Sequence, residues 1–414
     1  MNSLKKPAAT QSLIHYLGTS VGIIHPKLPS IADKLCPPEF LGSDLLPSND
    51  WQGLIQQAIH HRVFPLLYQA LVSQETHIPQ DLMAQLKKIN NQKALRSIVL
   101  TGELFRILDI LEKQNIPTIA YKGPVLAMLA YGTISTRSFD DLDILVQPQD
   151  FFKPKKILQS HGYEAKLLSM LSSKQEQRFF GRLGEYLMVN SETNIHLDIH
   201  CRCIAGDGFA EFLDLSCFWD RLQTIQLMGR RVQTFCPEDL LLFICIGAGK
   251  DGWPYLKHVC DLAALIQHHP NLDWNQILNE AKRLRMEQIL RIGLLLIRTL
   301  LHLPLNDRLL EFAQSSPSAL WISHRIAQRL SSSQPPLSNN PSLERFLVRW
   351  IMLDYVPHKI AYIWDKVIWN IKLLFMVNDL DHQVFSLPRP LHFIYYVIRP
   401  IRLIYKYRPH LRLN

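Results

Sequence analysis

The sequence contains no Cys-x-x-Cys pair, and its seven cysteines are an odd number. A disulfide framework or a zinc ribbon is therefore not expected, and a reducing cytoplasm is the simpler expectation. No apolar run is long enough for a membrane span, because residues 360–377, the best candidate, contain Asp365, Lys366, Asn370 and Lys372. The first residues lack the apolar core of a signal peptide. These absences predict a cytoplasmic protein.

Charged residues make up 20% of the chain and hydrophobic residues 47%, which is a globular balance that argues against disorder. A length of 414 residues suggests two domains, or one domain with a large helical extension. The formal net charge of +9 favours an anionic partner. Nucleotides, nucleic acid and an acidic membrane surface all fit that charge.

Changes in the spacing of apolar residues along the sequence mark the expected boundaries between its parts. Helical spacing recurs over residues 51–73 and 81–114, and again from Pro237 onward, with short β-branched runs between. The expected parts are an irregular lead-in (1–48), a core with N-terminal helices (49–235), a helical domain (236–330), a linker (331–341) and an aromatic, basic extension (342–414). The fold class predicted is α+β, with a small mixed sheet flanked by helices and followed by a helical domain.

Four strands are expected in the core. The runs are residues 116–121, 142–146, 185–189 and 195–201, and the last two are separated by Asn190-Ser-Glu-Thr-Asn194, which predicts a hairpin. Helices are expected at 124–131, where Pro124 suits the first turn and Gly132 the end, and at 148–161.

Three aspartates are the candidate catalytic and metal-binding residues. Asp141 and Asp143 lie two apart and would share one face of a strand, while Asp140 has the opposite phase. Two neighbouring carboxylates repel each other unless a positive ion lies between them, and Mg²⁺ binds such oxygens together with substrate phosphates. Asp198 alternates with Leu197 and Ile199, so pairing of its strand beside the first would bring a third carboxylate to the site. An Asp-x-Asp pair alone is common in solvated turns.

A phosphate-binding end is predicted upstream of the aspartates. Lys122 and Gly123 lie between a strand and a helix, where free N–H groups attract phosphate and glycine permits close approach. Lys122 and Arg137 would add positive charge to a nucleotide-binding site. The alternative is ordinary loop chemistry with both side chains in water.

Taken together, these motifs resemble the uncharacterised bacterial nucleotidyltransferase family of the DNA polymerase β-like superfamily. The resemblance covers residues 50–300 and rests on Lys122 to Gly132, Arg137, Asp141 to Val146, His196 to His200, Cys236 to Phe243, Lys250, Trp253, Leu256 and Asp261. Lys122-Gly123 stands where many superfamily members carry Gly-Ser, and Gly247-Ala-Gly-Lys250 lacks the histidine that the family pattern has before the lysine.

The resemblance implies Mg²⁺-dependent transfer of a nucleoside monophosphate from an NTP, such as ATP, to an unidentified acceptor, with release of pyrophosphate. Asp141 and Asp143 would be metal ligands, with Mn²⁺ as the alternative ion, and Asp198 a ligand or the base. Lys250, in the helical half, is a candidate for nucleotide binding, although a surface position between helices is an equal alternative.

Three other interpretations stay open. His196, Asp198 and His200 share a face that could hold zinc, but no fourth ligand is evident, and the histidines are rather expected to orient Asp198 or a substrate group. The fold could bind nucleotide or nucleic acid without turnover. Residues 383–414 contain six Lys or Arg and no Asp or Glu, and could reach an anionic membrane surface or pack on their own domain.

Overall fold

The computed structural model of the protein describes residues 10, 12–18, 51–73, 78–165, 184–202, 216–331, 349–375, 394, 398–400 and 402. The chain forms two compact units, one of residues 1–206 and 213–354 and the other of residues 207–212 and 355–414. The finer domain boundaries expected from the sequence stay predictions. Apart from Ser331, the expected linker 331–341 lies outside the described residues.

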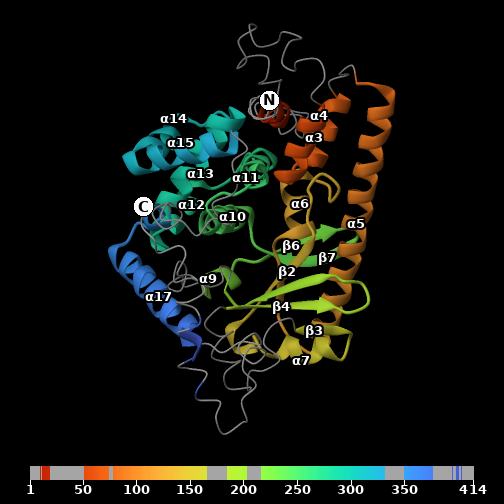
Figure 1. Cartoon of the computed structure of the whole chain (residues 1–414), viewed down its shortest axis with the longest axis vertical. Helices are drawn as coiled ribbons and strands as arrows, with labels where there is room; N and C mark the ends of the chain where they lie inside the picture. The colour runs from red at the N-terminus through yellow and green to blue at the C-terminus, as the bar shows by residue number, and fades with distance from the viewer. Residues whose placement is uncertain are drawn as a thin grey trace. The chain divides into compact units, whose positions relative to one another are not determined.

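A five-stranded mixed sheet forms the centre of the larger unit (Figure 1). Its order is β1-β2-β5-β4-β3, and only the β2–β5 pair is parallel. The strands are β1 (Thr118–Ala120), β2 (Asp141–Val146), β3 (Tyr163–Ala165), β4 (Glu185–Asn190) and β5 (His196–His200). The predicted α+β class, and the predicted hairpin, which is β4–β5, are confirmed.

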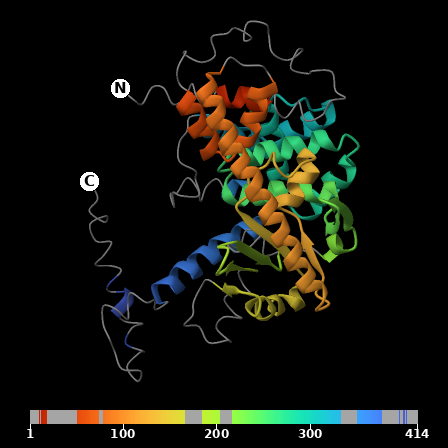
Figure 2. The same cartoon turned by 90° about the vertical axis from the view of Figure 1, so that its right-hand side faces the viewer.

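Apolar side chains on β2 explain its central place. Leu142, Ile144 and Val146 are fully buried on one face of the strand. The helix α5 (Gln80–Glu112) contacts β1 and β2, and the helix α6 (Gly123–Tyr131) also contacts β2. Figures 1 and 2 show α5 as the long orange helix beside the strands. The alternate positions Asp141 and Asp143 belong to the other face of β2.

Several elements differ from the expected pattern. The helix expected over 51–73 is two helices, α3 (Trp51–His60) and α4 (Phe64–Ser73), because Arg62 between them takes a left-handed conformation with φ 60°. The helix expected over 148–161 is a 3₁₀ turn, η2 (Pro148–Asp150), followed by α7 (Lys153–Gln159). The strand β3 was not expected. Neither was the hairpin of β6 (Gln223–Leu227) and β7 (Arg230–Thr234).

The helical half follows β7 in the same unit. It comprises α10 (Pro237–Asp251), α11 (Leu256–His268), α12 (Trp274–Arg283), α13 (Glu287–Leu301), α14 (Asp307–Gln314) and α15 (Pro317–Ser331), after the short α9 (Ser216–Trp219). The apolar side chains of α11 and α13 are almost all buried. The helix α11 contacts α6, so the helical half packs directly on the core.

The smaller unit contains the helix α17 (Val356–Phe375). Among the described residues, no helix combines the length and the apolar character needed to cross a membrane.

A buried ion pair joins α11 to the loop after α6. Arg137 Nε donates to both carboxylate oxygens of Asp261 at 3.0 Å, and the Tyr131 hydroxyl donates to Asp261 Oδ1 at 2.9 Å. The side chains of Arg137 and Asp261 are only 6% and 2% exposed. Because a buried charge that loses its partner is costly, this pair makes the packing of α11 on α6 specific.

We therefore expect Arg137→Met to lower the free energy of unfolding by about 3–5 kcal/mol, because Asp261 would be left buried without its cation. Urea denaturation measures this change. Lys156→Met, which removes an exposed lysine of α7, is the control and should cost less than about 1 kcal/mol. A similar small loss in both variants would show that the Arg137 pair does not secure the interface.

Candidate metal and nucleotide site

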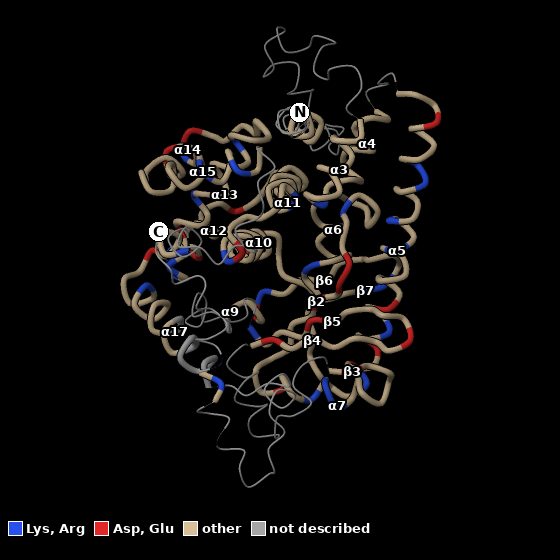
Figure 3. The backbone as a smooth tube through the Cα atoms, in the orientation of Figure 1, with Lys and Arg blue, Asp and Glu red and all other residues tan. Residues whose placement is uncertain are grey.

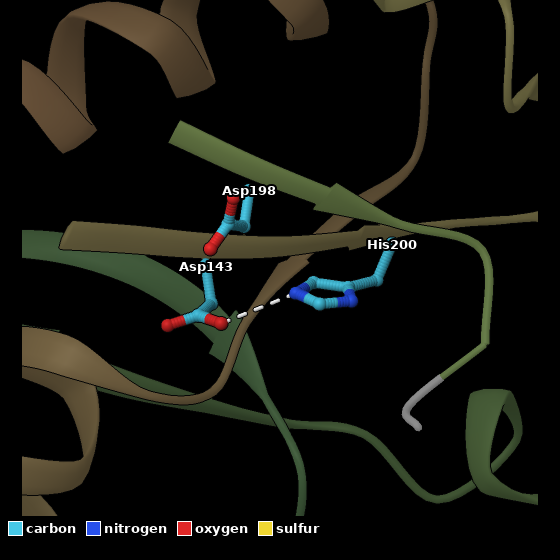
Figure 4. Close-up of side chains that lie close together, drawn as sticks. All are labelled: Asp143, Asp198 and His200. Atoms are coloured by element: carbon cyan, nitrogen blue, oxygen red, sulfur yellow. Dashed lines mark hydrogen bonds and ion pairs between the residues drawn. The ribbon is translucent and has the colours of Figure 1, made fainter. Parts of the chain in front are cut away.

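The parallel pairing of β2 and β5 brings two of the three predicted aspartates together. Asp143 lies opposite Asp198, Asp141 opposite His196 and Leu145 opposite His200. Figure 4 shows the carboxylates of Asp143 and Asp198 side by side, with the His200 ring directed at Asp143. One ligand atom from each of Asp143, Asp198 and His200 lies within 4.8 Å of the others.

Asp143 is the most buried member of this cluster. Its Oδ1 accepts from Lys122 Nζ at 2.6 Å and contacts His200 Nε2 at 3.1 Å, and its side chain is 8% exposed. Burial alone would raise the pKa of Asp143, but the Lys122 charge and the His200 hydrogen bond hold that pKa well below its usual value. Asp143 is therefore ionised across the whole neutral range.

Asp198 has the opposite behaviour. Burial, together with the charges of Asp143, Asp141 and Glu185, raises the pKa of Asp198 to about 7, although the Lys122 charge acts in the opposite direction. Its carboxyl group therefore exchanges a proton near neutral pH. Two adjacent carboxyl groups whose pKa values are pushed apart are typical of acid–base sites.

His200 connects the cluster to the neighbouring strand. Its Nδ1 lies 3.5 Å from Glu185 Oε2 on β4, close enough for an ion pair, although no hydrogen bond forms there among the described residues. Its ring meets the Tyr121 ring edge-on at 6.2 Å. His200 is thus held between Asp143 and the β4 edge of the site, where it can orient or share a ligand.

The predicted phosphate loop adjoins the cluster. Lys122 caps α6 in an extended conformation, and Gly123 follows with φ +52°, a conformation that favours glycine. Burial opposes the charged form of Lys122, but the contact with the Asp143 carboxylate outweighs it and raises the pKa of Lys122, so its ammonium group stays charged. Lys122 therefore neutralises Asp143 directly, a contact that the sequence did not reveal.

The remaining predicted site residues lie at different distances from the cluster. Asp141 is partly buried, shares the strand face of Asp143, and its charge influences Asp198 and Lys122. His196 is partly buried opposite Asp141.

The two other basic residues predicted for the site, Arg137 and Lys250, lie outside the cluster. Arg137 is paired with Asp261, and its Nη1 also donates to the Gly123 carbonyl at 3.5 Å. Lys250 lies in the last turn of α10, with no contact to the cluster in the described part of the chain. Their predicted roles stay predictions.

Two basic residues near the site were missed by sequence reasoning. They are Lys257 on α11 and Arg62 after α3. The charges of Arg62, Arg137, Asp261 and Asp141 all act on the pKa of Lys257. The available signal was the position of Lys257 four residues before Asp261, one helical turn away on the same face. Segments of both charge signs lie close together around the sheet in Figure 3.

The donor set suits a divalent cation. Two carboxylates, one of them with its charge fixed by a neighbouring lysine, offer the oxygens that Mg²⁺ and Mn²⁺ prefer, and His200 offers one nitrogen. The zinc alternative relied on His196 beside Asp198 and His200. In the described residues the cluster joins Asp143 to these two instead.

Comparison with known proteins places the chain. A family described as "Uncharacterised nucleotidyltransferase" matches residues 47–302, which is well over half of the chain. The chain belongs to this family. The match includes both strands of the carboxylate cluster, Lys122-Gly123 and most of the helical half, and the protein is accordingly a nucleotidyltransferase. No curated protein matches the sequence.

Two solved structures show weaker likeness. One is a lincosamide antibiotic adenylyltransferase, LnuA, with lincomycin bound, at 22% identity and with a TM-score of 0.29. The match covers 40% of this chain and 94% of LnuA. The other is an antigenic nucleotidyltransferase-like protein from Paracoccidioides brasiliensis, at 15% identity and with a TM-score of 0.26. The match covers 46% of this chain and 86% of that protein. Both TM-scores lie below 0.5, so the assignment comes from the family match.

Removal of Lys122 should tighten metal binding. In Lys122→Met, a cation would no longer compete for Asp143 Oδ1, so we expect Mn²⁺ to bind at least tenfold more tightly at pH 8, a gain of about 1.4 kcal/mol. Isothermal titration calorimetry without nucleotide measures this gain. Lys156→Met, an exposed lysine on α7, is the control and should leave the affinity unchanged. An unchanged affinity in Lys122→Met would mean that metal does not bind at Asp143.

Proposed function

We propose that the protein is a Mg²⁺-dependent enzyme that transfers a nucleoside monophosphate from an NTP to an acceptor and releases pyrophosphate. The observation that carries this proposal is the cluster of Asp143, Asp198 and His200 within 4.8 Å, beside the Lys122-Gly123 start of α6. A carboxylate pair next to a helix N-terminus provides one place for metal and one for phosphate.

Each residue has a proposed role. Asp141 and Asp143 would hold the metal, and His200 and His196 would orient the ligands. Lys122, Gly123 and Arg137 would border the triphosphate, with Lys250 approaching from α10. When bound, the metal supplies positive charge that stabilises the pentavalent transition state and the leaving phosphates. With Mg²⁺ or Mn²⁺ in place, the Lys122 ammonium would be free to turn from Asp143 to the phosphates.

The transfer step is a displacement at the α-phosphorus. The acceptor atom forms a bond to the α-phosphorus while the bond from that phosphorus to the bridging oxygen breaks, and pyrophosphate leaves with the electron pair. Asp198, with a pKa near 7, can take the acceptor proton at neutral pH or complete the metal site as a third ligand. ATP is the first donor to test, and the acceptor class is open.

Asp143→Asn should reduce nucleotide incorporation at least 100-fold, because the amide cannot supply the charge that holds the metal, a loss of about 3 kcal/mol in transition-state stabilisation. The measurement is incorporation of label from each α-labelled NTP into acceptors of a cell extract. Asp140→Asn, an exposed neighbour of opposite phase, is the matched control and should keep wild-type activity. Full activity in Asp143→Asn would refute the site assignment.

A second proposed property is attachment to an anionic membrane surface through the smaller unit. On α17, exposed apolar side chains recur at helical spacing along one face, namely Val356, Ile360, Ile363, Trp364, Val367 and Ile368. After Asp379 and Asp381 the sequence continues into residues 383–414, with six basic and no acidic side chains; four of the six, all but Arg399 and Arg402, lie outside the described residues. An exposed apolar helix face followed in the sequence by basic residues suits an anionic lipid surface.

Trp364→Ser should therefore reduce co-sedimentation with vesicles that contain phosphatidylglycerol at least threefold, because it removes an interfacial aromatic group. Trp321→Ser, which removes a similarly exposed tryptophan from α15, is the control and should sediment like wild type. Equal sedimentation of all three proteins, or binding that does not depend on anionic lipid, would exclude this attachment.

A further inference from the structure

One face of α11 is aligned with the phosphate loop. Asp261 on this face holds Arg137, and the Arg137 guanidinium reaches the Gly123 carbonyl at the start of α6. Lys257 lies one helical turn before Asp261 and therefore on the same face. The helix thus presents a second lysine toward the residues that begin α6.

Four cations gather in this region. The charges of Arg137 and Arg62 lower the pKa of Lys257, and those of Asp261 and Asp141 partly oppose this shift. The charges of Arg137, Arg62 and Lys122 also lower the pKa of His258. Arg137 and Lys122 already have carboxylate partners, Asp261 and Asp143. In the part of the chain that the structure describes, neither Lys257 nor Arg62 forms an ion pair with a carboxylate. Among the described residues, Lys257 and Arg62 are therefore the two cations of this group that no carboxylate contacts directly.

Backbone contacts between the end of α3 and the start of α11 bring Lys257 and Arg62 close together. The Lys257 amide donates to the His61 carbonyl at 3.3 Å, and the Leu256 amide donates to His61 Nδ1 at 3.4 Å. The Arg62 guanidinium lies over the Tyr255 ring at 4.9 Å. These contacts join the residues that end α3 to the first turn of α11, so the backbone positions of Lys257 and Arg62 are fixed relative to each other without a ligand.

The charge of Lys257 is unfavourable in this arrangement without an anion. Burial, followed by the charges of Arg137 and Arg62, lowers the pKa of Lys257 to about 7. Arg62 has φ 60° because it ends α3 in the left-handed conformation usual at a helix C-terminus, where the Val63 amide donates to the Ala58 carbonyl at 2.8 Å. A lysine whose charge is disfavoured, held beside an arginine and next to a loop suited to phosphate, indicates a ligand of negative charge.

We propose that Lys257 and Arg62 form an anion subsite that binds the outer phosphates of the triphosphate and holds pyrophosphate after transfer. This subsite rests on the proposed function for its physiological ligand, but its binding of polyphosphate does not require turnover. A lysine and an arginine suit a pyrophosphate group, because the guanidinium can bind two oxygens and the ammonium adds a point charge. The α-phosphate would then lie between this subsite and the carboxylate cluster.

The test is calorimetric titration of inorganic pyrophosphate into the full-length protein in EDTA, so that neither metal nor acceptor takes part. Lys257→Met and Arg62→Gln should each weaken pyrophosphate binding at least tenfold. Lys257→Arg keeps the charge and should restore binding to within threefold of wild type. Lys282→Met, an exposed lysine on α12, is the matched control and should bind like wild type. Circular dichroism melting of each variant identifies any loss through unfolding.

The outcomes separate this subsite from the transfer reaction. Wild-type binding of pyrophosphate in Lys257→Met, or no binding by the wild-type protein, would overturn the subsite even if nucleotide transfer were demonstrated. Conversely, binding that depends on Lys257 in a protein without transferase activity would support the subsite and count against the proposed reaction. Sulfate at equal ionic strength should compete weakly, because one tetrahedral anion can engage only part of the pair.

Discussion

The charge balance around Asp143 governs the arrangement of the whole site. A carboxylate with 8% of its side chain exposed, at the centre of a sheet, stays ionised only because Lys122 and His200 contact the same oxygen. That requirement fixes the end of β1, the start of α6 and the last residue of β5 relative to one another. The apolar residues of β2 bury the strand, and the polar contacts of Asp143 determine which side chains gather at its open face.

The sequence pattern predicted much of this arrangement. A period of two places Asp141 and Asp143 on one face of β2, and the alternation of Leu197, Asp198 and Ile199 identifies a second polar face. The parallel pairing in the structure confirms that Asp198 lies beside Asp143. These features are local or follow from burial, so they can be read from residue order alone.

Other features depend on tertiary register. His196 and His200 share one face of β5, and only the pairing with β2 decides that His200 lies next to Asp143 while His196 lies opposite Asp141. The contact of Lys122 with Asp143 likewise joins residues 21 apart along the chain. The break at Arg62 has no glycine, but Pro65 in the first turn of α4 was an available signal for a new helix start. The β6–β7 hairpin was missed because its strands are polar, although Gly229 in its two-residue turn was an available signal.

The edges of the sheet have a consequence for self-association. Both edge strands, β1 and β3, are only three residues long, and β1 also contacts β7 of the small hairpin. A second chain that added a strand to either edge would gain few main-chain hydrogen bonds, since short edges are a common protection against sheet extension. The central sheet is therefore protected against extension by another chain at both of its edges, so β2 and β5, which carry the carboxylate cluster, stay in its interior.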